Sequence, residues 1–337
     1  MTQARIAKYQ AHTNIALIKY WGKRNQELIL PVTSSLSLTL EAFYTQTKVE
    51  FSDQFAKDQF ILNGHPQSHE ATTKVSHYVD LFRRTAGIIL PVKITSDNYV
   101  PTAAGLASSA SAFAALACAC NDALDLNLNP HELSIMARQG SGSASRSLFG
   151  GFVEWEKGSG EDSNSSFARP FDSADWDIAM IALVLNHQSK KYSSRKAMQH
   201  TIESSPFYKL WPEEVAKDLE LIKSAIKQKD LKQIGEIAEH NAMKMHATML
   251  AANPSFTYFE SDSLKAMNLI KEMRNAGLSC YYTMDAGPNV KILCPYSQSQ
   301  QIKKHLLHYF NESQIIISQA GPAPFALDLS EVKNETF

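Results

Sequence analysis

The sequence has few cysteines, glycines and prolines, and each shortage excludes a class of protein. Four cysteines occur in 337 residues, at Cys118, Cys120, Cys280 and Cys294, and none of them forms a C-x-x-C pair. This spacing disfavours zinc and dithiol redox motifs, so we expect reduced, buried or half-buried thiols in a cytoplasmic protein. Glycine and proline together number 27 (14 and 13), too few for a collagen-like or low-complexity chain.

The chain also lacks an excess of charge of either sign. Lys and Arg number 33 and Asp and Glu number 34, which gives a net charge of −1. A nucleic acid or an anionic membrane surface would require a basic excess, so we expect neither as a partner. A balanced total can still contain a local cluster of cations, so an anion-binding site is not excluded.

Long hydrophobic runs are missing as well. The stretch 103–120 is interrupted by Gly105 and by serines, and the stretch 178–185 is too short to span a bilayer. No apolar segment follows the two cations of residues 1–10, as it would in a secretory signal peptide. We therefore expect a soluble cytoplasmic protein.

What the sequence does contain is an ordinary globular mixture, 44% hydrophobic and 20% charged, of a length that predicts about two domains. Polar and apolar residues alternate in the first third, whereas long amphipathic helical patterns follow residue 190, which predicts an α+β fold. We expect strands at 35–40, 45–51, 60–62, 92–95, 152–155, 178–185, 280–284, 290–294 and 314–318. We expect helices at 70–86, along an alanine-rich run that ends at 124, and at 130–138, 211–229, 230–250, 264–276 and 299–310.

A loop of small residues leads into the alanine-rich helix at 101–110 (PTAAGLASSA). Such a loop lets the backbone approach a phosphate closely, and the helix N-terminus offers free N–H groups and a positive dipole end. Ser108 and Ser109 add hydroxyls for phosphate or Mg²⁺. The motif is neither a Walker A loop nor G-x-G-x-x-G, and an ordinary helix cap followed by a packed alanine face is the alternative.

Two further segments offer groups that could bind or activate a substrate. Residues 140–147 (GSGSASRS) surround Arg146 with glycine and serine, and an arginine can grip a carboxylate with two hydrogen bonds. The alternative there is a flexible loop with a surface arginine.

Asp285 follows an apolar strand and precedes Gly287-Pro288, so it is either an acid that faces a cleft or an ordinary turn residue.

Cations gather at two more places. In 14–25 (NIALIKYWGKRN), lysines and an arginine flank Tyr20 and Trp21, which suits a polyanion or an amphipathic strand with a polar end. Residues 190–196 combine cations with hydroxyls, which suits either an anion site or a solvated loop.

The histidines show no H-E-x-x-H spacing and no cysteine framework, so we expect no metal site built from protein ligands alone.

Taken together, these motifs resemble the diphosphomevalonate (mevalonate diphosphate) decarboxylase family of the GHMP kinase superfamily. The resemblance runs from about residue 11 to 327 and includes Ala104 and Ala107, where the related kinases have more glycine. Its segments, in order, are 14–23 (NIALIKYWGK), 101–110 (PTAAGLASSA), 140–147 (GSGSASRS), 150–157 (GGFVEWEK), 246–248 (HAT), 284–291 (MDAGPNVK) and 319–324 (QAGPAP).

The resemblance implies a reaction and a fold. Mevalonate 5-diphosphate, ATP and Mg²⁺ would give isopentenyl diphosphate, ADP, phosphate and CO₂. An ATP-binding domain like domain 2 of ribosomal protein S5 would cover 1–190, and a ferredoxin-like domain would cover 191–330, with the active site in the cleft between them. A homodimer is implied as well. The alternatives are a phosphomevalonate decarboxylase or mevalonate 3-kinase of the same fold, or a catalytically silent binding protein.

The resemblance also implies roles for individual residues. Asp285 would face the C3 hydroxyl of the substrate, Lys23 would lie beside that acid, and Arg146 would bind the substrate carboxylate. The residues implied around the substrate are Lys19, Tyr20, Trp21, Gly22, Lys23, Ser141, Gly142, Ser143, Ala144, Ser145, Arg146, Ser194 and Arg195. Those implied around ATP are Ser96, Asn98, Pro101, Ala103, Ala104, Gly105, Leu106, Ala107, Ser108 and Ser109, with Ser108 also near Mg²⁺.

Overall fold

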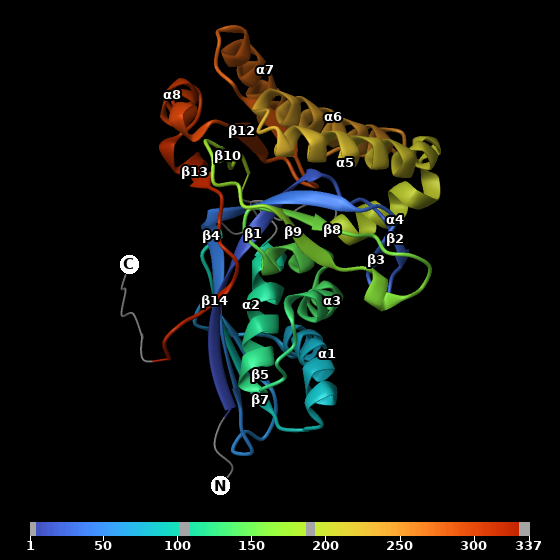
Figure 1. The fold of residues 1–337 in the computed structure, drawn as a ribbon, viewed down its shortest axis with the longest axis vertical. Coiled ribbons are helices and arrows are strands. Elements are labelled where there is room, and N and C mark those ends of the chain that lie inside the picture. The colour runs from blue at the N-terminus through green and yellow to red at the C-terminus, as the bar shows by residue number, and fades with distance from the viewer. Residues whose placement is uncertain (1–4, 101–107, 187–192, 330–337) are drawn as a thin grey trace.

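The computed structural model describes residues 5–100, 108–186 and 193–329, which form two main sheets with helices packed against them (Figure 1). The first sheet has the strand order β14-β1-β4-β7-β5-β6, with β8 paired to β4 and β9 paired to β8, and the second has the order β11-β12-β10-β13. The strands are β1 (Arg5–Ile18), β2 (Lys23–Asn25), β3 (Leu30–Pro31), β4 (Ser35–Phe51), β5 (Gln59–Leu62), β6 (His65–Pro66), β7 (Val92–Asn98), β8 (Phe152–Trp155), β9 (Ala168–Asp172), β10 (Ala179–Leu183), β11 (Tyr281–Met284), β12 (Val290–Cys294), β13 (Ile315–Gln319) and β14 (Phe325–Ala326).

The helices surround these sheets, and most of them lie where the sequence predicts them. They are α1 (His69–Ala86), α2 (Ser108–Ala123), α3 (Pro130–Gly140), α4 (Ser194–Ser204), α5 (Trp211–Lys227), α6 (Leu231–Leu250), α7 (Ser261–Asn275) and α8 (Tyr296–Leu306), with 3-10 segments η1 (Gly142–Leu148), η2 (Ser163–Ser165), η3 (Pro206–Leu210) and η4 (Glu312–Gln314). None of the helices in the described ranges is long and apolar enough to cross a membrane. The α+β class is confirmed.

The two longest strands, β1 and β4, form the spine of the first sheet. They pair antiparallel from Arg5 opposite Phe51 to Ile18 opposite Leu36. The sequence predicts separate strands at 35–40 and 45–51, and this prediction is wrong because β4 continues through both. The ladder passes from His12–Tyr44 to Asn14–Thr39, so residues 40–43 form an irregularity that interrupts the alternation.

One more predicted boundary is wrong, and the structure decides between the alternatives for two other segments. Strand β7 continues past the predicted end at residue 95, because residues 96–98 pair with 45–47 of β4. The segment 140–147 is largely the 3-10 helix η1 with most of its residues buried, not a flexible loop. The cationic segment after residue 193 forms helix α4, since the Ser193 side chain accepts a hydrogen bond from the Lys196 N–H and caps it.

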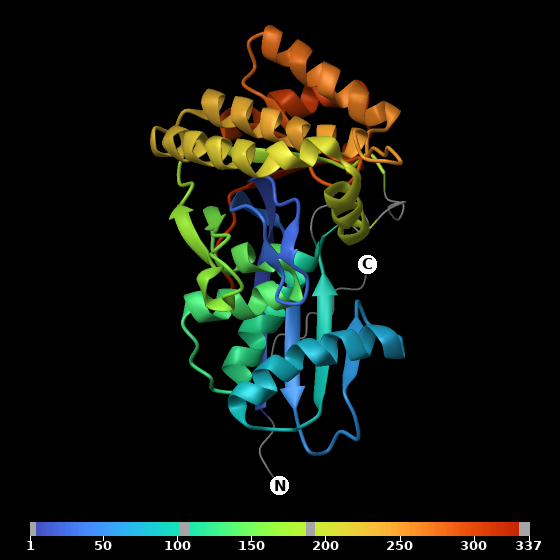
Figure 2. The same ribbon diagram turned by 90° about the vertical axis from the view of Figure 1, so that its right-hand side faces the viewer.

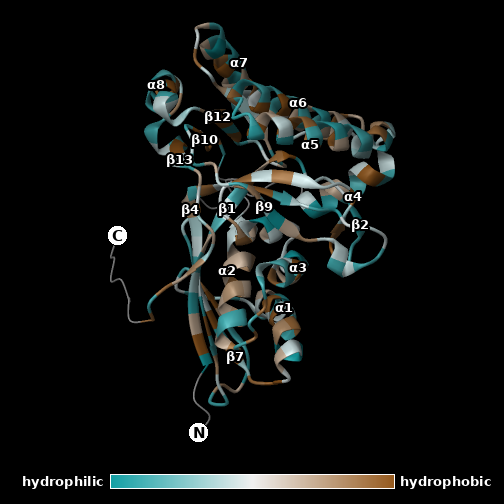
Figure 3. Cartoon of the chain, in the orientation of Figure 1, coloured by the Kyte–Doolittle hydropathy of each residue, from teal (hydrophilic) through white to brown (hydrophobic). Residues whose placement is uncertain are grey.

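The two halves share one hydrophobic core. Ile15 and Leu38 from the first sheet, Met180 from the second, and Ile222 and Met245 from α5 and α6 belong to a single buried cluster. Figures 1 and 2 show α5 and α6 side by side across one end of the first sheet, and Figure 3 shows hydrophobic and hydrophilic residues along both helices. Burial of one face of each helix therefore holds the end of β1 in place.

The chain also crosses between the sheets twice. Strand β10 precedes residue 190, yet it lies in the second sheet between β12 and β13. Strand β14 returns to the first sheet, where Phe325 pairs with Gln10 and Ala326 pairs with Tyr9. These crossings bring residues from distant parts of the sequence to the junction between the two halves, where the cavity described below lies.

Candidate active site

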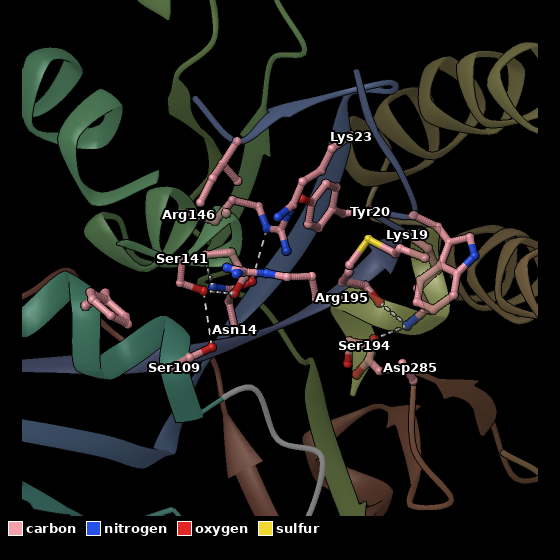
Figure 4. A pocket seen from close by; sticks show the side chains of 18 of the residues that line it. Asn14, Lys19, Tyr20, Lys23, Ser109, Ser141, Arg146, Ser194, Arg195 and Asp285 are labelled. Atoms are coloured by element: carbon pink, nitrogen blue, oxygen red, sulfur yellow. Dashed lines mark hydrogen bonds and ion pairs between the residues drawn. The ribbon is translucent and has the colours of Figure 1, made fainter. Parts of the chain in front are cut away.

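A cavity of about 440 Å³ opens at the junction of the two halves (Figure 4). It is bordered by the end of β1 and the segment after it, by the start of α2, by η1, by α4 and by the turn after β11. The residues expected at the site that line it are Lys19, Tyr20, Trp21, Lys23, Ser108, Ser109, Ser141, Gly142, Ser143, Arg146, Ser194, Arg195 and Asp285. Motifs that are far apart in the sequence therefore meet at one place.

Asp285 is held between two buried lysines. Its Oδ1 lies 2.8 Å from Nζ of Lys19, and its Oδ2 lies 3.3 Å from Nζ of Lys291, whose side chains are 1% and 0% exposed. Burial raises the pKa of Asp285, but the two ammonium groups more than offset this and hold the pKa well below its usual range. The carboxylate is therefore charged at every pH at which proteins normally work.

The lysine beside Asp285 is Lys19 and not Lys23, which corrects the expectation. Strand β1 ends at Ile18, so Lys19 is directed at once toward the turn that carries Asp285. The chain then turns at Gly22, whose φ is +126°. Lys23 follows this turn on β2, makes no ion pair with Asp285, and faces Arg195 instead. Figure 4 shows Lys19 next to Asp285, with Lys23 on the other side of Tyr20.

The pKa values of both lysines are depressed. Burial lowers the pKa of Lys19 to about 8, with Lys291 and Arg146 adding to the effect and Asp285 opposing it. Burial also lowers the pKa of Lys23 to about 8, and the charge of Arg195 contributes. Each lysine therefore exchanges its proton much nearer to neutral pH than an exposed lysine does.

Arg146 is buried, 2% exposed, and is fixed by neutral groups. Its Nε donates to Asn14 Oδ1 at 3.1 Å, another guanidinium nitrogen donates to the Ser35 hydroxyl, and the guanidinium carbon lies 5.7 Å from the centre of the Trp155 ring. Burial lowers the pKa of Arg146 to about 10, although Asp285 opposes this shift. No carboxylate in the described parts of the chain lies within ion-pair distance of Arg146, so its charge is available to a ligand.

The rest of the cavity is suited to anions. Ser108 and Ser109 open α2, and Oγ of Ser109 lies 3.2 Å from Oγ of Ser141. The first turn of α2 contains no acidic residue, so its free N–H groups and positive dipole end are not neutralised. Within the described ranges no group of three His, Cys, Asp or Glu residues could hold a metal ion.

Some expected residues do not line the cavity. Gly22 lies between Trp21 and Lys23, which do line the cavity, but is itself packed against Tyr208. The Ser145 hydroxyl is turned away from the cavity and donates a hydrogen bond to the Gly142 carbonyl, at 2.8 Å. Ala144, within η1, is fully buried and belongs to the hydrophobic core. Ser96 and Asn98 lie on β7, and their roles toward the nucleotide stay predictions. Pro101, Ala103, Ala104, Gly105, Leu106 and Ala107 lie outside the described residues.

Sequence reasoning missed three polar residues of the site. Asn14 begins the 14–25 motif, and its amide bridges Arg146 to the Ser143 carbonyl and the Ser147 hydroxyl. Lys291 sits inside the 284–291 motif, where a lysine within an apolar strand was a usable signal. Lys74 lines the cavity from α1, and its place on an amphipathic helix gave no signal.

The sequence of this chain matches models of a known protein family. Residues 11–168 match the diphosphomevalonate decarboxylase-like N-terminal domain, and 180–334 match the mevalonate 5-diphosphate decarboxylase C-terminal domain. The diphosphomevalonate decarboxylase of Candida albicans is 36% identical, with 94% of this chain and 97% of that protein covered.

Solved structures with a similar fold come from the same family. The mevalonate diphosphate decarboxylase of Staphylococcus aureus is 51% identical with a TM-score of 0.93, and the match covers 97% of this chain and 99% of that one. A second structure, 48% identical with a TM-score of 0.91 and covering 96% and 99%, is a complex with MVAPP, AMPPCP and magnesium. The paired domain matches, the shared fold and the clustered motifs lead to one conclusion: this chain belongs to the diphosphomevalonate decarboxylase family.

Proposed function

We propose that this enzyme converts (R)-5-diphosphomevalonate and ATP into isopentenyl diphosphate, ADP, phosphate and CO₂. The observation that carries the proposal is the ionised carboxylate of Asp285 between Lys19 and Lys291, in one cavity with the unpaired guanidinium of Arg146. A substrate with a hydroxyl and a carboxylate on neighbouring carbons has complementary groups. Relatives that bind MVAPP and AMPPCP support the same assignment.

The site can hold the substrate at both of its anionic ends. Arg146 would bind the carboxylate through two hydrogen bonds, which fix its orientation. Lys23, Ser194 and Arg195 line the same cavity and would bind the diphosphate. The hydroxyl of Tyr20 is buried and, among the described residues, has no hydrogen-bond partner, so it is free to donate to a phosphate oxygen.

Asp285 would orient the reacting group. The C3 hydroxyl of the substrate donates a hydrogen bond to the carboxylate, which aligns the oxygen with the γ-phosphate of ATP. Because the pKa of Asp285 is held so low, the carboxylate is a weak base, and its main contribution is orientation. Lys19 keeps the carboxylate in position and offsets its charge near the incoming phosphoryl group.

The remaining chemistry follows from the substrate. Phosphorylation turns the tertiary hydroxyl into a good leaving group, and the departure of phosphate builds positive charge at C3. Loss of CO₂ then supplies the electron pair of the new double bond. Because Arg146 and Lys19 are buried, water screens their charges little, and they act strongly on charge that develops beside them.

The residues present fit ATP and Mg²⁺ as cofactors. The hydroxyls of Ser108 and Ser109 stand exposed at the positive end of α2, where phosphates bind well. Since the described chain has no ready-made metal cluster, the phosphates would supply most of the ligands of Mg²⁺, with Ser108 beside them. A bound Mg²⁺ would neutralise part of the phosphate charge.

The proposal is tested by incubating the purified protein with mevalonate 5-diphosphate, ATP and Mg²⁺ and counting ADP and CO₂ together. Equal amounts of the two products are expected. ADP without CO₂ would identify a 3-kinase that stops after phosphorylation. Turnover of mevalonate monophosphate alone would identify a phosphomevalonate decarboxylase, and no product from either substrate would favour a silent binding protein.

We also propose that the enzyme is a cytoplasmic homodimer. The proposal rests on the family resemblance, since the balanced charge and the free, buried cysteines only agree with such a location. Light scattering on the purified protein should give twice the chain mass of 37.5 kDa. A mass equal to one chain would contradict the dimer.

A further inference from the structure

A chain of hydrogen bonds runs from the reacting centre into the second half of the molecule. The backbone N–H of Lys19 donates to Oδ1 of Asn241 on α6, at 2.8 Å, and Nδ2 of Asn241 donates to Oδ2 of Asp218 on α5, also at 2.8 Å. The ammonium of Lys244 then binds both oxygens of Asp218, at 2.9 and 3.1 Å. Lys244 also donates to Glu214, at 2.8 Å.

The inner part of this network is buried in an apolar environment. Asn241 is 0% exposed and Asp218 is 6% exposed, while Ile222 on α5 and Ala238 and Met245 on α6 belong to the hydrophobic core around them. Burying an amide and a carboxylate costs free energy unless every partner is satisfied. Apolar side chains of similar size would stabilise a core as well or better, so stability alone does not account for this network.

The network fixes the backbone of Lys19, whose ammonium pairs with the Asp285 carboxylate. Lys19 is the first residue after β1, so no strand partner fixes its N–H. Its ammonium bridges the Ala16 carbonyl, at 2.6 Å, and the Asp285 carboxylate, at 2.8 Å. The side chain of Asn241 therefore sets where the backbone of Lys19 lies, and through it where the ammonium meets Asp285.

We propose that Asn241 and Asp218 are positioning residues for the decarboxylase reaction: Asp218 orients the Asn241 amide, and Asn241 fixes Lys19 against Asp285. Neither residue touches the substrate, and both come from the half of the chain that does not contain Lys19. The inference rests on the proposed function, because it concerns the same carboxylate. It adds a requirement that α5 and α6 must be in place before the site is correctly aligned.

The test uses Asn241→Ala, Asn241→Asp and the double variant Asn241→Asp with Asp218→Asn, assayed as full-length enzyme. Loss of the amide should lower kcat at least about tenfold, because small misplacements of reacting groups are costly, while KM for ATP stays unchanged. Asn241→Asp should be impaired too, since two carboxylates would face each other. The double variant exchanges amide and carboxylate, so it restores both hydrogen bonds and should recover most of the lost kcat.

A matched control separates positioning from stability. Ser134→Ala removes another buried hydrogen bond, which the backbone N–H of Ala168 donates to the Ser134 hydroxyl at 3.0 Å, away from the cavity. It should lower Tm and leave kcat unchanged. The positioning role is overturned if Asn241→Ala lowers only Tm, or if the double variant folds but recovers no activity. A parent enzyme that releases no CO₂ would instead overturn the proposed function, and this role with it.

Discussion

At the scale of single residues, the site depends on one carboxylate between two buried cations. Each of the three charges is tolerable only because the others are present, since an isolated buried charge is strongly disfavoured. The geometry therefore ties the chemistry of Asp285 to the burial of Lys19 and Lys291. Changes at these positions should alter activity and stability together.

Asp285→Asn keeps the size of the side chain and removes its charge. We expect kcat to fall by about 10², the cost of misplacing a reacting group, because the C3 hydroxyl loses the acceptor that would orient it, while ATP still binds. The free energy of unfolding should fall by about 3 kcal/mol, because two buried lysines lose their partner. CO₂ release and urea unfolding measure the two effects. A variant with a normal rate would remove Asp285 from the reaction.

The two lysines should differ in their effects. Lys19→Met removes the partner of Asp285, so it should lower kcat at least about tenfold. Lys23→Met removes a cation that we propose binds the diphosphate, so it should mainly raise KM for mevalonate 5-diphosphate, by about tenfold. Steady-state kinetics with both variants decide the matter, and the reverse pattern would place Lys23 beside the acid.

The activity should depend on pH at the alkaline side only. Lys19 and Lys23 both lose their protons as the pH rises through about 8, so kcat/KM should fall above that pH. The pKa of Asp285 is held far below its usual range, so Asp285 should cause no loss of activity between pH 8 and pH 5. A profile of kcat at saturating substrate and ATP avoids the titration of their free phosphates, and an acidic limb there that Asp285→Asn removes would contradict an ionised Asp285.

At the scale of elements, tight turns set the direction of the site residues. Gly22 adopts a φ of +126°, and a Cβ at this position would lie 1.8 Å from the hydroxyl of Tyr208, which donates to the Trp21 carbonyl at 3.0 Å. The turn therefore separates Lys19 from Lys23 and packs the segment between them against η3. Only glycine fits there without moving Tyr208.

Gly22→Ala should consequently destabilise the enzyme and raise KM for the substrate, because Trp21 and Lys23 must move. Gly277→Ala is the matched control: its φ of +96° imposes similar strain, but nothing lies within 4 Å of an added Cβ. We expect Gly22→Ala to cost about 1–3 kcal/mol more than the control, the usual range for overpacking. Equal melting temperatures for the two variants would contradict the role of the close contact.

The same scale shows how far the sequence could predict the structure. Helices such as α1 and α6 could be predicted from their amphipathic patterns, and Asp285 and Arg146 could be singled out from their motifs. The partner of Asp285 could not be predicted from spacing, because it depends on where β1 ends and which way the chain turns. The continuity of β4 through 40–43 was hidden because an irregular ladder breaks the alternation.

At the scale of the whole molecule, the two halves are joined by more than their shared core. Lys223 on α5 lies 2.6 Å from Glu154 on β8, whose side chain is 3% exposed and which also pairs with Arg169 at 3.1 Å. The expected division of the chain at residue 190 stays a prediction. A buried ion pair and a common core both favour unfolding as one unit.

We therefore expect urea unfolding followed by far-UV circular dichroism and by tryptophan fluorescence to give coincident transitions. Lys223→Met should lower the common urea midpoint and reduce the free energy of unfolding by about 2 kcal/mol, because Glu154 loses the shorter of its ion pairs. Lys217→Met, which removes an exposed lysine from the same helix, should have little effect. Two separated transitions in the parent enzyme would show that the halves unfold independently.

The return of β14 to β1 has a consequence for how the protein is made. On the ribosome, the strand that pairs with Tyr9 and Gln10 emerges more than 300 residues after β1 (325 − 10 = 315). Until then the nascent first sheet keeps one edge of β1 uncovered, and such an edge readily pairs with other chains. Completion of this sheet must therefore wait until β14 has been synthesised, long after most of the other strands of the sheet.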